Sequence, residues 1–472
     1  MSNSSKLSAK DRVLTLLDNN SFVEIGALVT KRNTDFNLQT KEAPSDGVIT
    51  GYGTINDGPV YVYSQDASVL NGTIGEMHAK KIERIYDLAM KCGAPVIGLI
   101  DCGGLRIEEA TDALEGLGSV MTKQVLASGV IPQIAVIFGS CGGGLSVSAS
   151  LNDFVFVEKN GKLFLNTPNA VKGNNTDKCD TSSAEFKAGC GAADFTAEGE
   201  VEILNEVRNL VSVIPACNDD DAALSECDDD LNRLTDAFAD EAADPAVALA
   251  DISDGGFFIE VQKDFAKEMV TGFIKLDGVT VGAVANRAAV LKDGKAEEKF
   301  ETKLTHCGCS KAAKFVNFCD AFEIPVLTLT NVDGYGACMC NEKKLSREAA
   351  ALISAFADAT CPKVNVVIKG IGSAYTVMNS KATGADMVFA LEGAQIGPMA
   401  SDLAVQILTG DQKDEAKKAE YEKLQLSAES AAKRGYVDAI IAPADVRRNV
   451  VYAFEMLYLK AEERPGKKHK TV

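Results

Sequence analysis

The sequence contains only three histidines in 472 residues, and His78, His306 and His469 lie far apart along the chain. A catalytic triad built on histidine is therefore disfavoured. The sequence also lacks any run of about 18 apolar residues, the length that a membrane-spanning helix requires. Its polar start, MSNSSKLSAKDR, does not have the pattern of a signal peptide. We therefore expect a cytoplasmic protein whose chemistry comes from other residue types.

Basic residues are scarce relative to acidic ones. There are 48 Lys and Arg against 67 Asp and Glu, which gives a net charge of −19. Such a chain is poorly suited to a broad nucleic-acid-binding or membrane-binding surface. We expect no nucleic-acid partner, although a local basic patch is still compatible with an anionic ligand.

The 13 cysteines show no spacing typical of a secreted disulfide scaffold. One cluster resembles a metal site, with ligand types at His306, Cys307, Cys309, Cys338 and Cys340. Its spacing is Cys-x-Cys rather than Cys-x-x-Cys, and no second histidine lies nearby. We therefore predict no metal and interpret these residues as small thiols, mostly buried.

A glycine-rich turn stands out in IFGSCGGGLSVSA, residues 137–149. A phosphate-binding loop would continue with Lys and then Ser or Thr, whereas Leu145 and Ser146 follow here. The other chemical use of such a turn is to point backbone N–H groups at a developing oxyanion. A tight strand-to-helix connection is the structural alternative.

The two halves of the chain repeat one pattern, which predicts two copies of one domain. Matching prolines and glycines are 230 positions apart in three pairs, Pro95 and Pro325, Pro132 and Pro362, Gly142 and Gly372. In both halves, apolar strand-like runs alternate with helical patterns, so we expect an α/β fold with domains at 1–235 and 236–472. The acidic segment 215–246 is interpreted as a solvated linker, with a docking surface as the alternative. The glycine turn occurs twice, at 141–145 and 371–375, which predicts two oxyanion sites and two substrates with carbonyl groups.

Long segments of the chain resemble one known family. They are residues 45–66, 75–104, 126–144, 311–327, 359–390, 434–448 and the PGKKH sequence at 465–469. The sequence resembles the carboxyltransferase subunits of biotin-dependent acyl-CoA carboxylases, of the propionyl-CoA carboxylase beta type. It also resembles the alpha subunits of sodium-pumping acyl-CoA decarboxylases, of the methylmalonyl-CoA decarboxylase type.

The resemblance implies two tandem crotonase-like (ClpP/crotonase) domains of the β-β-α superhelix type. It implies an acyl-CoA site in the N-terminal half, a biotin site in the C-terminal half, and a homo-oligomer, a dimer at least and a hexamer in some assemblies. The oxyanion pairs of the family fall on Gly143 and Gly144 in the first half and on Ser373 and Ala374 in the second. In this chemistry the ureido nitrogen of biotin takes the α-proton, so no histidine base is needed.

The resemblance also assigns binding residues. For the acyl-CoA it points to Gly103, Gly104 and Thr376, with Lys80, Lys81 and Arg106 as the candidates for the CoA phosphates, and for biotin to Gly334, Tyr335, Gly372 and Met399. Each of the three basic residues has a solvated surface charge as its alternative role. For Thr376 the alternative is an ordinary helix position, and for Met399 it is a place in the core.

The sequence departs from the family pattern at several places. The motif Ser-Gly-Gly-Ala-Arg-Ile-Gln-Glu-Gly is CGGLRIEEA at 102–110, and Gly-Gly-Ala-Tyr is Gly-Ser-Ala-Tyr at 372–375. The turn Asp-Val-Pro-Gly-Phe is NVDGY within 331–336, and 341–352 replaces a segment that carries Gly-Gly and His. Serine tolerates a positive φ poorly, so Ser373 puts the geometry of the second turn in question.

The sequence has no Met-Lys-Met biotin attachment motif and no ATP-binding loop. The resemblance therefore implies a separate biotin carboxyl carrier protein, plus a biotin carboxylase or a membrane decarboxylase subunit. Our main hypothesis is carboxyl transfer between carboxybiotin and propionyl-CoA or methylmalonyl-CoA, with decarboxylation of glutaconyl-CoA or malonyl-CoA as the alternative. Two further alternatives are a crotonase-type hydratase, isomerase or hydrolase using Glu108 or Glu109, and a non-catalytic CoA-binding assembly subunit.

Overall fold

The computed structural model describes residues 6–32, 38–172, 179–220, 225–292, 294–410 and 414–466, so His469 and most of 465–469 lie outside it. The chain divides into two compact units, Met1–Ala223 and Leu224–Val472. The second unit begins earlier than residue 236, because Ser225 N donates to Gly278 O at 2.9 Å and Thr235 N to Ala444 O at 2.9 Å. Part of the acidic segment 215–246 is therefore bonded to the second unit.

The first unit is built on a seven-stranded sheet in the order β1-β2-β3-β4-β5-β7-β9. The first three strands pair antiparallel and the others parallel. The strands of this sheet are β1 Val23–Glu24, β2 Val48–Ile55, β3 Gly58–Gln65, β4 Val96–Ile100, β5 Gln133–Ile137, β7 Phe154–Glu158 and β9 Phe195–Ala197, and a small second sheet pairs β6 Ser140–Gly142 with β8 Lys162–Phe164. The helices are α1 Ala9–Leu16, α2 Glu76–Cys92, α3 Thr111–Ala127, α4 Gly144–Ser150, α5 Ala184–Gly189 and α6 Glu200–Val211.

The second unit repeats this plan with the strand order β10-β11-β12-β15-β16-β17-β18, again antiparallel first and then parallel. Its strands are β10 Ile259–Val261, β11 Met269–Leu276, β12 Val279–Asn286, β15 Val326–Asp333, β16 Lys363–Ile371, β17 Met387–Gly397 and β18 Ala439–Ile441, with a hairpin of β13 Ala289–Lys292 and β14 Lys295–Lys299. Its helices are α7 Phe238–Glu241, α8 Pro245–Ile252, α9 His306–Ala321, α10 Met339–Asp358, α11 Ala374–Val377, α12 Ser401–Thr409, α13 Glu415–Tyr421, α14 Ala428–Lys433 and α15 Val446–Leu457.

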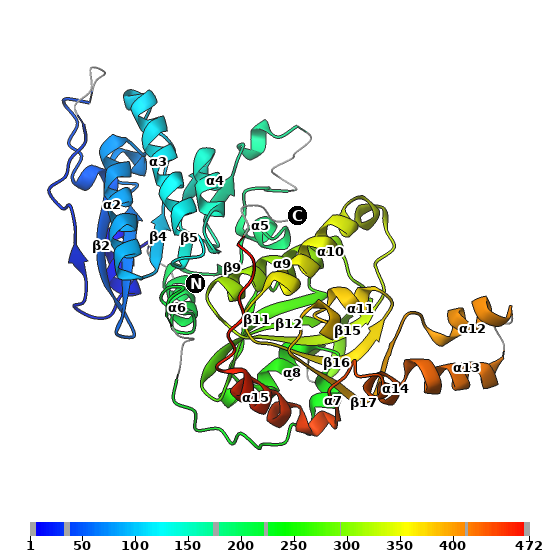
Figure 1. The fold of residues 1–472 in the computed structure, drawn as a ribbon. Coiled ribbons are helices and arrows are strands. Elements are labelled where there is room, and N and C mark those ends of the chain that lie inside the picture. The colour runs from blue at the N-terminus through cyan, green and yellow to red at the C-terminus, as the bar shows by residue number, and fades with distance from the viewer. Residues whose placement is uncertain are drawn as a thin grey trace. The chain divides into compact units, whose positions relative to one another are not determined.

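The central strands of both sheets form because their sequences are almost continuously apolar. All five residues of β4 and all five of β5 are buried, as expected for parallel strands covered on both faces. The predicted strands at 95–100, 134–138 and 153–157 are confirmed as β4, β5 and β7. Helices cover these strands in each unit: α2 and α3 lie side by side in the first, and α9 and α10 in the second (Figure 1).

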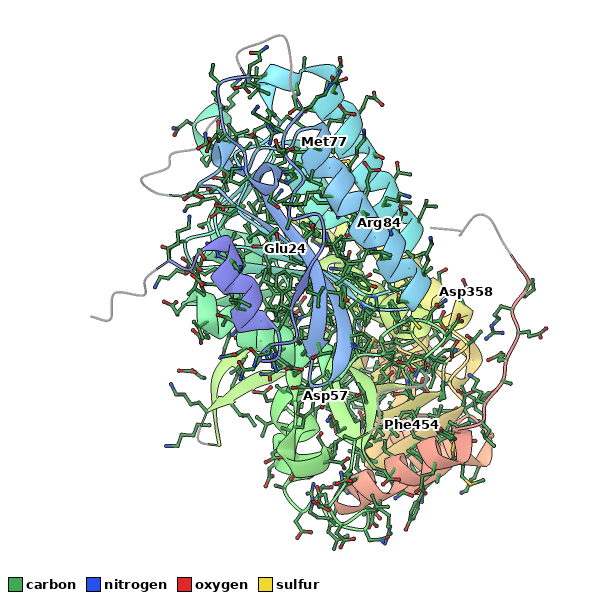
Figure 2. The ribbon with its side chains drawn as sticks, turned by 90° about the vertical axis from the view of Figure 1, so that its left-hand side faces the viewer. Glu24, Asp57, Met77, Arg84, Asp358 and Phe454 are labelled. Carbon is green, nitrogen blue, oxygen red and sulfur yellow. The ribbon has the colours of Figure 1, made fainter. Side chains whose placement is uncertain are left out.

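Helix α2 runs along the first sheet beside the β2–β3 hairpin. Figure 2 shows Met77 and Arg84 on this helix and Asp57 at the end of the hairpin. The buried side of α2 consists of His78, Ala79, Lys81, Ile82, Ile85, Tyr86 and Ala89. The helix ends at Gly93, which has a φ of 62° and so provides the left-handed C-cap that this position needs.

A buried lysine occurs at the same place in each half. Lys81 on α2 donates from Nζ to the carbonyl oxygens of Ser45 and Val48, and Lys311 on α9 donates to those of Gln262 and Phe265 at 2.8 and 2.9 Å. Both lysines are at most 5 % exposed, and burial lowers the pKa of each to about 8. Each lysine holds one loop to its helix through main-chain carbonyls. The duplication thus extends to a buried polar contact.

Across the described residues, no helix is long and apolar enough to cross a bilayer.

Candidate functional site

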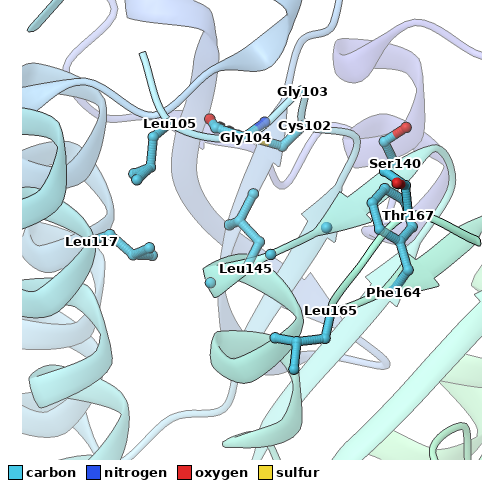
Figure 3. A pocket seen from close by; sticks show the side chains of 13 residues that line it. Cys102, Gly103, Gly104, Leu105, Leu117, Ser140, Leu145, Phe164, Leu165 and Thr167 are labelled. Atoms are coloured by element: carbon cyan, nitrogen blue, oxygen red, sulfur yellow. Dashed lines mark hydrogen bonds between the residues drawn. The ribbon is translucent and has the colours of Figure 1, made fainter. Parts of the chain in front are cut away.

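The first unit contains a cavity of about 430 Å³ beside the first glycine turn. The loop after β4 forms one side, the turn between β6 and α4 forms another, and α3 and the segment after β8 complete it. The residues that line it are Cys102, Gly103, Gly104, Leu105, Leu117, Ser140, Gly142, Gly143, Gly144, Leu145, Phe164, Leu165 and Thr167. Leu105, Leu117 and Leu145 approach the cavity from three different elements (Figure 3). The wall is therefore largely apolar, with backbone groups as its main polar component.

Gly143 makes the turn into α4 but is not an oxyanion donor. Its backbone has φ 60° and ψ −132°, a conformation that side chains strongly disfavour. Its N–H donates to Phe164 O at 3.0 Å and so continues the pairing of β6 with β8. The prediction for Gly143 as a donor is therefore wrong, because the strand ladder uses that N–H.

Gly144 and Leu145 supply the available donors instead. They are the first residues of α4, and the first N–H groups of a helix have no carbonyl acceptor one turn back. Among the described residues neither N–H has a hydrogen-bond acceptor. A Cβ on Gly144 would lie 2.9 Å from Leu117 Cδ2, so close packing as well as chemistry favours glycine there. The sequence pattern did not single out Leu145, because a backbone donor leaves no signal in its side chain.

The loop after β4 places Gly103 and Gly104 at the edge of the cavity. Gly103 N donates to Asn71 O at 2.8 Å, and Gly104 O accepts from Ile74 N at 2.9 Å. Gly104 has a φ of 111°, which requires glycine. Burial raises the pKa of the adjacent Cys102 thiol to about 12. That thiol stays protonated and does not act as a nucleophile.

Arg106 is not available for the phosphates of CoA, which corrects the prediction from the sequence. The residue is 1 % exposed, and its Nη1 donates to Asp46 Oδ1 at 2.6 Å and to Glu109 Oε1 at 2.8 Å. Its Nη2 donates to Thr73 O at 2.8 Å. The guanidinium therefore joins the cavity loop to neighbouring segments instead of facing solvent. Asp46, which the sequence analysis did not identify, is its buried partner.

The two carboxylates that bind Arg106 also cap α2. Glu109 Oε2 accepts from Glu76 N at 2.6 Å, and Asp46 Oδ2 accepts from His78 N at 2.8 Å. The N-cap residue, Gly75, has no side chain to do this itself. Glu109 is therefore committed to structure, while Glu108 pairs with Lys41 at 3.0 Å and has a lowered pKa. Neither carboxylate is placed as a base facing the cavity.

The other two basic candidates also differ from the prediction. Lys81 is buried against main-chain carbonyls, so it neither binds phosphate nor acts as a surface charge. The side chain of Lys80 is 56 % exposed and pairs with Glu76 at 2.6 Å. Of the three, only Lys80 keeps the exposure that a phosphate contact requires.

Because His78 is buried within this network, the pH dependence of stability provides a test of it. Burial, with help from the charges of Arg106 and Lys81, lowers the pKa of His78 from about 6.5 to about 3, against a smaller opposing effect of its contact with Asp46. Between pH 6.5 and 3 the unfolded chain therefore binds a proton that the folded chain does not. Stability should fall with falling pH by about 1.4 kcal/mol per unit from this residue alone.

His78→Gln should reduce that acid sensitivity, because glutamine does not titrate. Urea unfolding of both proteins at several pH values between 4 and 7 (a range of about three units around the histidine transition) gives the comparison. The expected result is a shallower loss of stability in the variant. Parallel profiles for the two proteins would contradict a neutral, buried His78.

The second turn, in the other unit, has the same backbone design one residue earlier in the repeat. Gly372 has a φ of 77°, and its N–H donates to Gly397 O at 2.8 Å, as Gly143 does to Phe164. Among the described residues, the N–H groups of Ser373 and Ala374 that follow have no acceptor. Ser373 has a φ of −66°, so the positive φ that would disfavour serine falls on Gly372 alone.

The loop after β15 lies against this turn. Gly334 Cα is 3.9 Å from the position that a Cβ on Gly372 would occupy. The Tyr335 hydroxyl is 3.4 Å from Ser373 Oγ. Beside them, Asp333 and Lys369 form an ion pair of 2.6 Å at the ends of β15 and β16. Tyr335 is 38 % exposed, so this loop leaves its phenol accessible.

The remaining two predicted residues lie near the same turn. Thr376 is exposed, and its Oγ1 donates to Ser373 O at 2.6 Å, which stabilises the start of α11. Met399 is half-buried between β17 and α12, next to Pro398, whose carbonyl lies 3.9 Å from the Cβ position of Gly372. Thr376 thus has a structural hydrogen bond, and Met399 follows a residue whose carbonyl approaches the turn.

The cysteine and histidine cluster forms helix contacts. The N and Nδ1 atoms of His306 lie 3.0 and 2.8 Å from Asn341 Oδ1, which joins the starts of α9 and α10. Cys338 caps α10 by accepting from Asn341 N at 3.4 Å. In the described part of the chain, no three His, Cys, Asp or Glu side chains are grouped to hold a metal ion. The altered segment 341–352 is part of α10.

These sites can be compared with known proteins. A family model described as the carboxyl transferase domain matches residues 2–472. The chain belongs to the carboxyl transferase family. It is 40 % identical, over an alignment of 495 residues, to the propionyl-CoA carboxylase beta chain of Roseobacter denitrificans, covering 99 % of this chain and 94 % of that one. It is 37 % identical to the methylmalonyl-CoA decarboxylase subunit alpha of Veillonella parvula, covering 98 % and 92 %.

A solved carboxyl transferase has the same fold. The structure of transcarboxylase 12S, described as a hexamer with hydrolysed methylmalonyl-coenzyme A bound, superposes with a TM-score of 0.91 at 34 % identity. The match covers 99 % of this chain and 92 % of that one. The prediction of an α/β fold with two tandem crotonase-like domains is confirmed, and so is the prediction that the protein is a carboxyltransferase enzyme.

Proposed function

We propose that this protein transfers a carboxyl group between biotin and a short-chain acyl-CoA, with propionyl-CoA and methylmalonyl-CoA as the substrate pair. The observation that carries the proposal is the repeated turn, a positive-φ glycine tied to a neighbouring strand and followed by two N–H groups that have no acceptor in the described part of the chain. Two such turns suit two carbonyl-containing partners. The names of the relatives support the acyl-CoA class.

In the first unit the chain itself stabilises an enolate. In this proposal the N–H groups of Gly144 and Leu145, which line the cavity, donate to the thioester oxygen, and each such donor is typically worth about 3 kcal/mol in the transition state. The leucine side chains of the cavity exclude water, which strengthens these hydrogen bonds. A cavity of about 430 Å³ bounded by Leu117 and Leu145 suits a short acyl group. Gly103 and Gly104 have no side chains, so the substrate can approach the protein backbone closely there. Lys80 is the cation proposed for the CoA phosphates.

In the second unit the donor set fits the oxygen of a ureido ring. Ser373 and Ala374 offer two N–H groups, with Gly334, Gly372 and Tyr335 beside them, and Met399 is the apolar residue proposed for the biotin ring. When bound there, biotin supplies the carboxyl group and a nitrogen that takes the α-proton. A proton acceptor on biotin agrees with the first unit, where neither Cys102 nor Glu109 serves as a base: Cys102 is protonated, and Glu109 is paired with Arg106.

The proposal includes the partners that this chemistry requires. They are a biotin carboxyl carrier protein and either a biotin carboxylase or a membrane decarboxylase subunit, with the chain itself in a homo-oligomer of two copies at least or, as in transcarboxylase 12S, six. The domain roles, acyl-CoA in 1–235 and biotin in 236–472, belong to the same proposal. So does the cytoplasmic location predicted from the sequence.

The test is incubation of the purified protein with methylmalonyl-CoA, malonyl-CoA or glutaconyl-CoA, with and without free biotin. We expect methylmalonyl-CoA to lose its carboxyl group only when biotin is present. Biotin-dependent loss from glutaconyl-CoA or malonyl-CoA instead would change the substrate and keep the reaction. If none reacts while the protein still binds CoA thioesters, the chain is a CoA-binding assembly subunit. Turnover of an enoyl-CoA without biotin would indicate a hydratase or isomerase.

A further inference from the structure

The second turn carries two side-chain hydroxyls in contact, those of Tyr335 and Ser373. Ser373 Oγ donates to the Tyr335 hydroxyl at 3.4 Å, a long distance for two hydroxyls. They come from different segments, Tyr335 from the loop after β15 and Ser373 from the turn after β16. The two segments approach closely, because Gly334 Cα lies 3.9 Å from the position that a Cβ on Gly372 would occupy.

The hydrogen bonding of this pair leaves one donor unused. Two hydroxyls contain two protons, and their mutual bond uses only the proton of Ser373. Among the described residues the phenolic O–H of Tyr335 has no acceptor, although the side chain is 38 % exposed and stands beside the N–H groups of Ser373 and Ala374. The nearby charged side chains do not compete for this phenolic O–H, because Asp333 and Lys369 pair with each other at 2.6 Å.

We propose that Tyr335 donates its phenolic proton to an oxygen of the biotin head, as a third donor beside the backbone pair, and that Ser373 Oγ orients it. Tyr335 is then a ligand-contacting residue, and the Ser373 side chain is a positioning residue. The proposal rests on the proposed function, since it names a contact within the biotin site. The resemblance places Phe and Gly at these two positions, so the pair belongs to this chain and cannot be read from the family pattern.

The experiment measures biotin-dependent decarboxylation of methylmalonyl-CoA with free biotin, for four proteins besides the unaltered one. They are Tyr335→Phe, Ser373→Ala, the double variant, and Tyr436→Phe as a matched control. Tyr436 is exposed and precedes β18, a strand parallel to β17, so it lies at the opposite edge of the sheet from the turn.

Tyr335→Phe should raise the KM for biotin about 10-fold, the effect of one lost hydrogen bond of ordinary strength. The KM for methylmalonyl-CoA should not change, because that substrate is held in the other unit. Ser373→Ala should raise the KM for biotin only about 3-fold, since it removes the hydroxyl that orients the Tyr335 phenol but leaves the phenol in place. It should have no further effect in the Tyr335→Phe background, and Tyr436→Phe should match the unaltered protein.

Three results would overturn the inference. The first is an unchanged KM for biotin in Tyr335→Phe while the unaltered protein is active. The second is an equal rise in both KM values, which indicates a general loss of structure. The third is additive effects in the double variant, which would mean that Ser373 acts independently of Tyr335. Absence of biotin-dependent turnover in the unaltered protein would refute the proposed function, and the inference with it.

Discussion

Replacing Ser373 by proline is expected to lower kcat by about 100-fold to 1,000-fold, the usual effect of removing one oxyanion donor. The substitution removes the backbone N–H, and the φ of −66° at Ser373 is the value that proline adopts without strain. The preceding residue is Gly372 with a φ of 77°, so no side chain stands in the way of the proline ring. The measurement is steady-state decarboxylation of methylmalonyl-CoA with free biotin.

Ser373→Ala is the matched control, because it keeps the N–H and removes only the hydroxyl. The two variants together separate the backbone donor from the side chain. Binding of a CoA thioester, which depends on the first unit, should be the same in both and shows that the chain has folded. A proline variant as active as the alanine variant would mean that the Ser373 N–H does not contact the reacting oxygen.

Replacing Arg106 by methionine is expected to destabilise the first unit by about 3–5 kcal/mol, the range for removing one member of a buried ion pair. The change leaves Asp46 and Glu109 buried without their cation. Burial already raises the pKa of Asp46 even with Arg106 present, so its carboxylate is poorly solvated. The measurement is urea unfolding followed by a signal from the first unit.

The same variant should also weaken binding of the acyl-CoA, because Arg106 ties the Gly103–Gly104 loop to the segment at Thr73. Lys123→Met is the matched control, since Lys123 pairs with Asp87 at 2.6 Å and both side chains are partly exposed to solvent. Exposed pairs contribute little, so this variant should have nearly unaltered stability. Equal stability of the two variants would contradict the role given to Arg106.

Much of the fold follows from local patterns. The apolar runs at 95–100, 134–138 and 153–157 became β4, β5 and β7, because burial on both faces requires a nearly continuous apolar run, which can be read from the sequence. The repeat of prolines and glycines at a constant offset predicted the duplicated domain, and the two sheets have the same strand order. The turn at Gly142–Gly144 was recognised because glycine is the residue that such a conformation needs.

The site was harder to predict wherever a role depends on a distant partner. Arg106 and Lys81 have the same side chains whether they face a phosphate or a buried carbonyl. Asp46 lies sixty positions before Arg106, and nothing local joins the two. At the first turn the N–H of Gly143 is occupied, because it pairs with Phe164 O, a residue that lies outside the turn in the sequence.

The sequence by itself determined the α/β class, the duplication and the two glycine turns, since these depend on periodicity and on the backbone freedom of single residues. Tertiary structure decided which cations are buried, which backbone donors remain unpaired, and that Tyr335 meets Ser373. The physical reason is that burial and hydrogen-bond pairing are properties of atoms brought together from distant segments. A residue's chemistry can be read from its identity, but its availability depends on what folds against it.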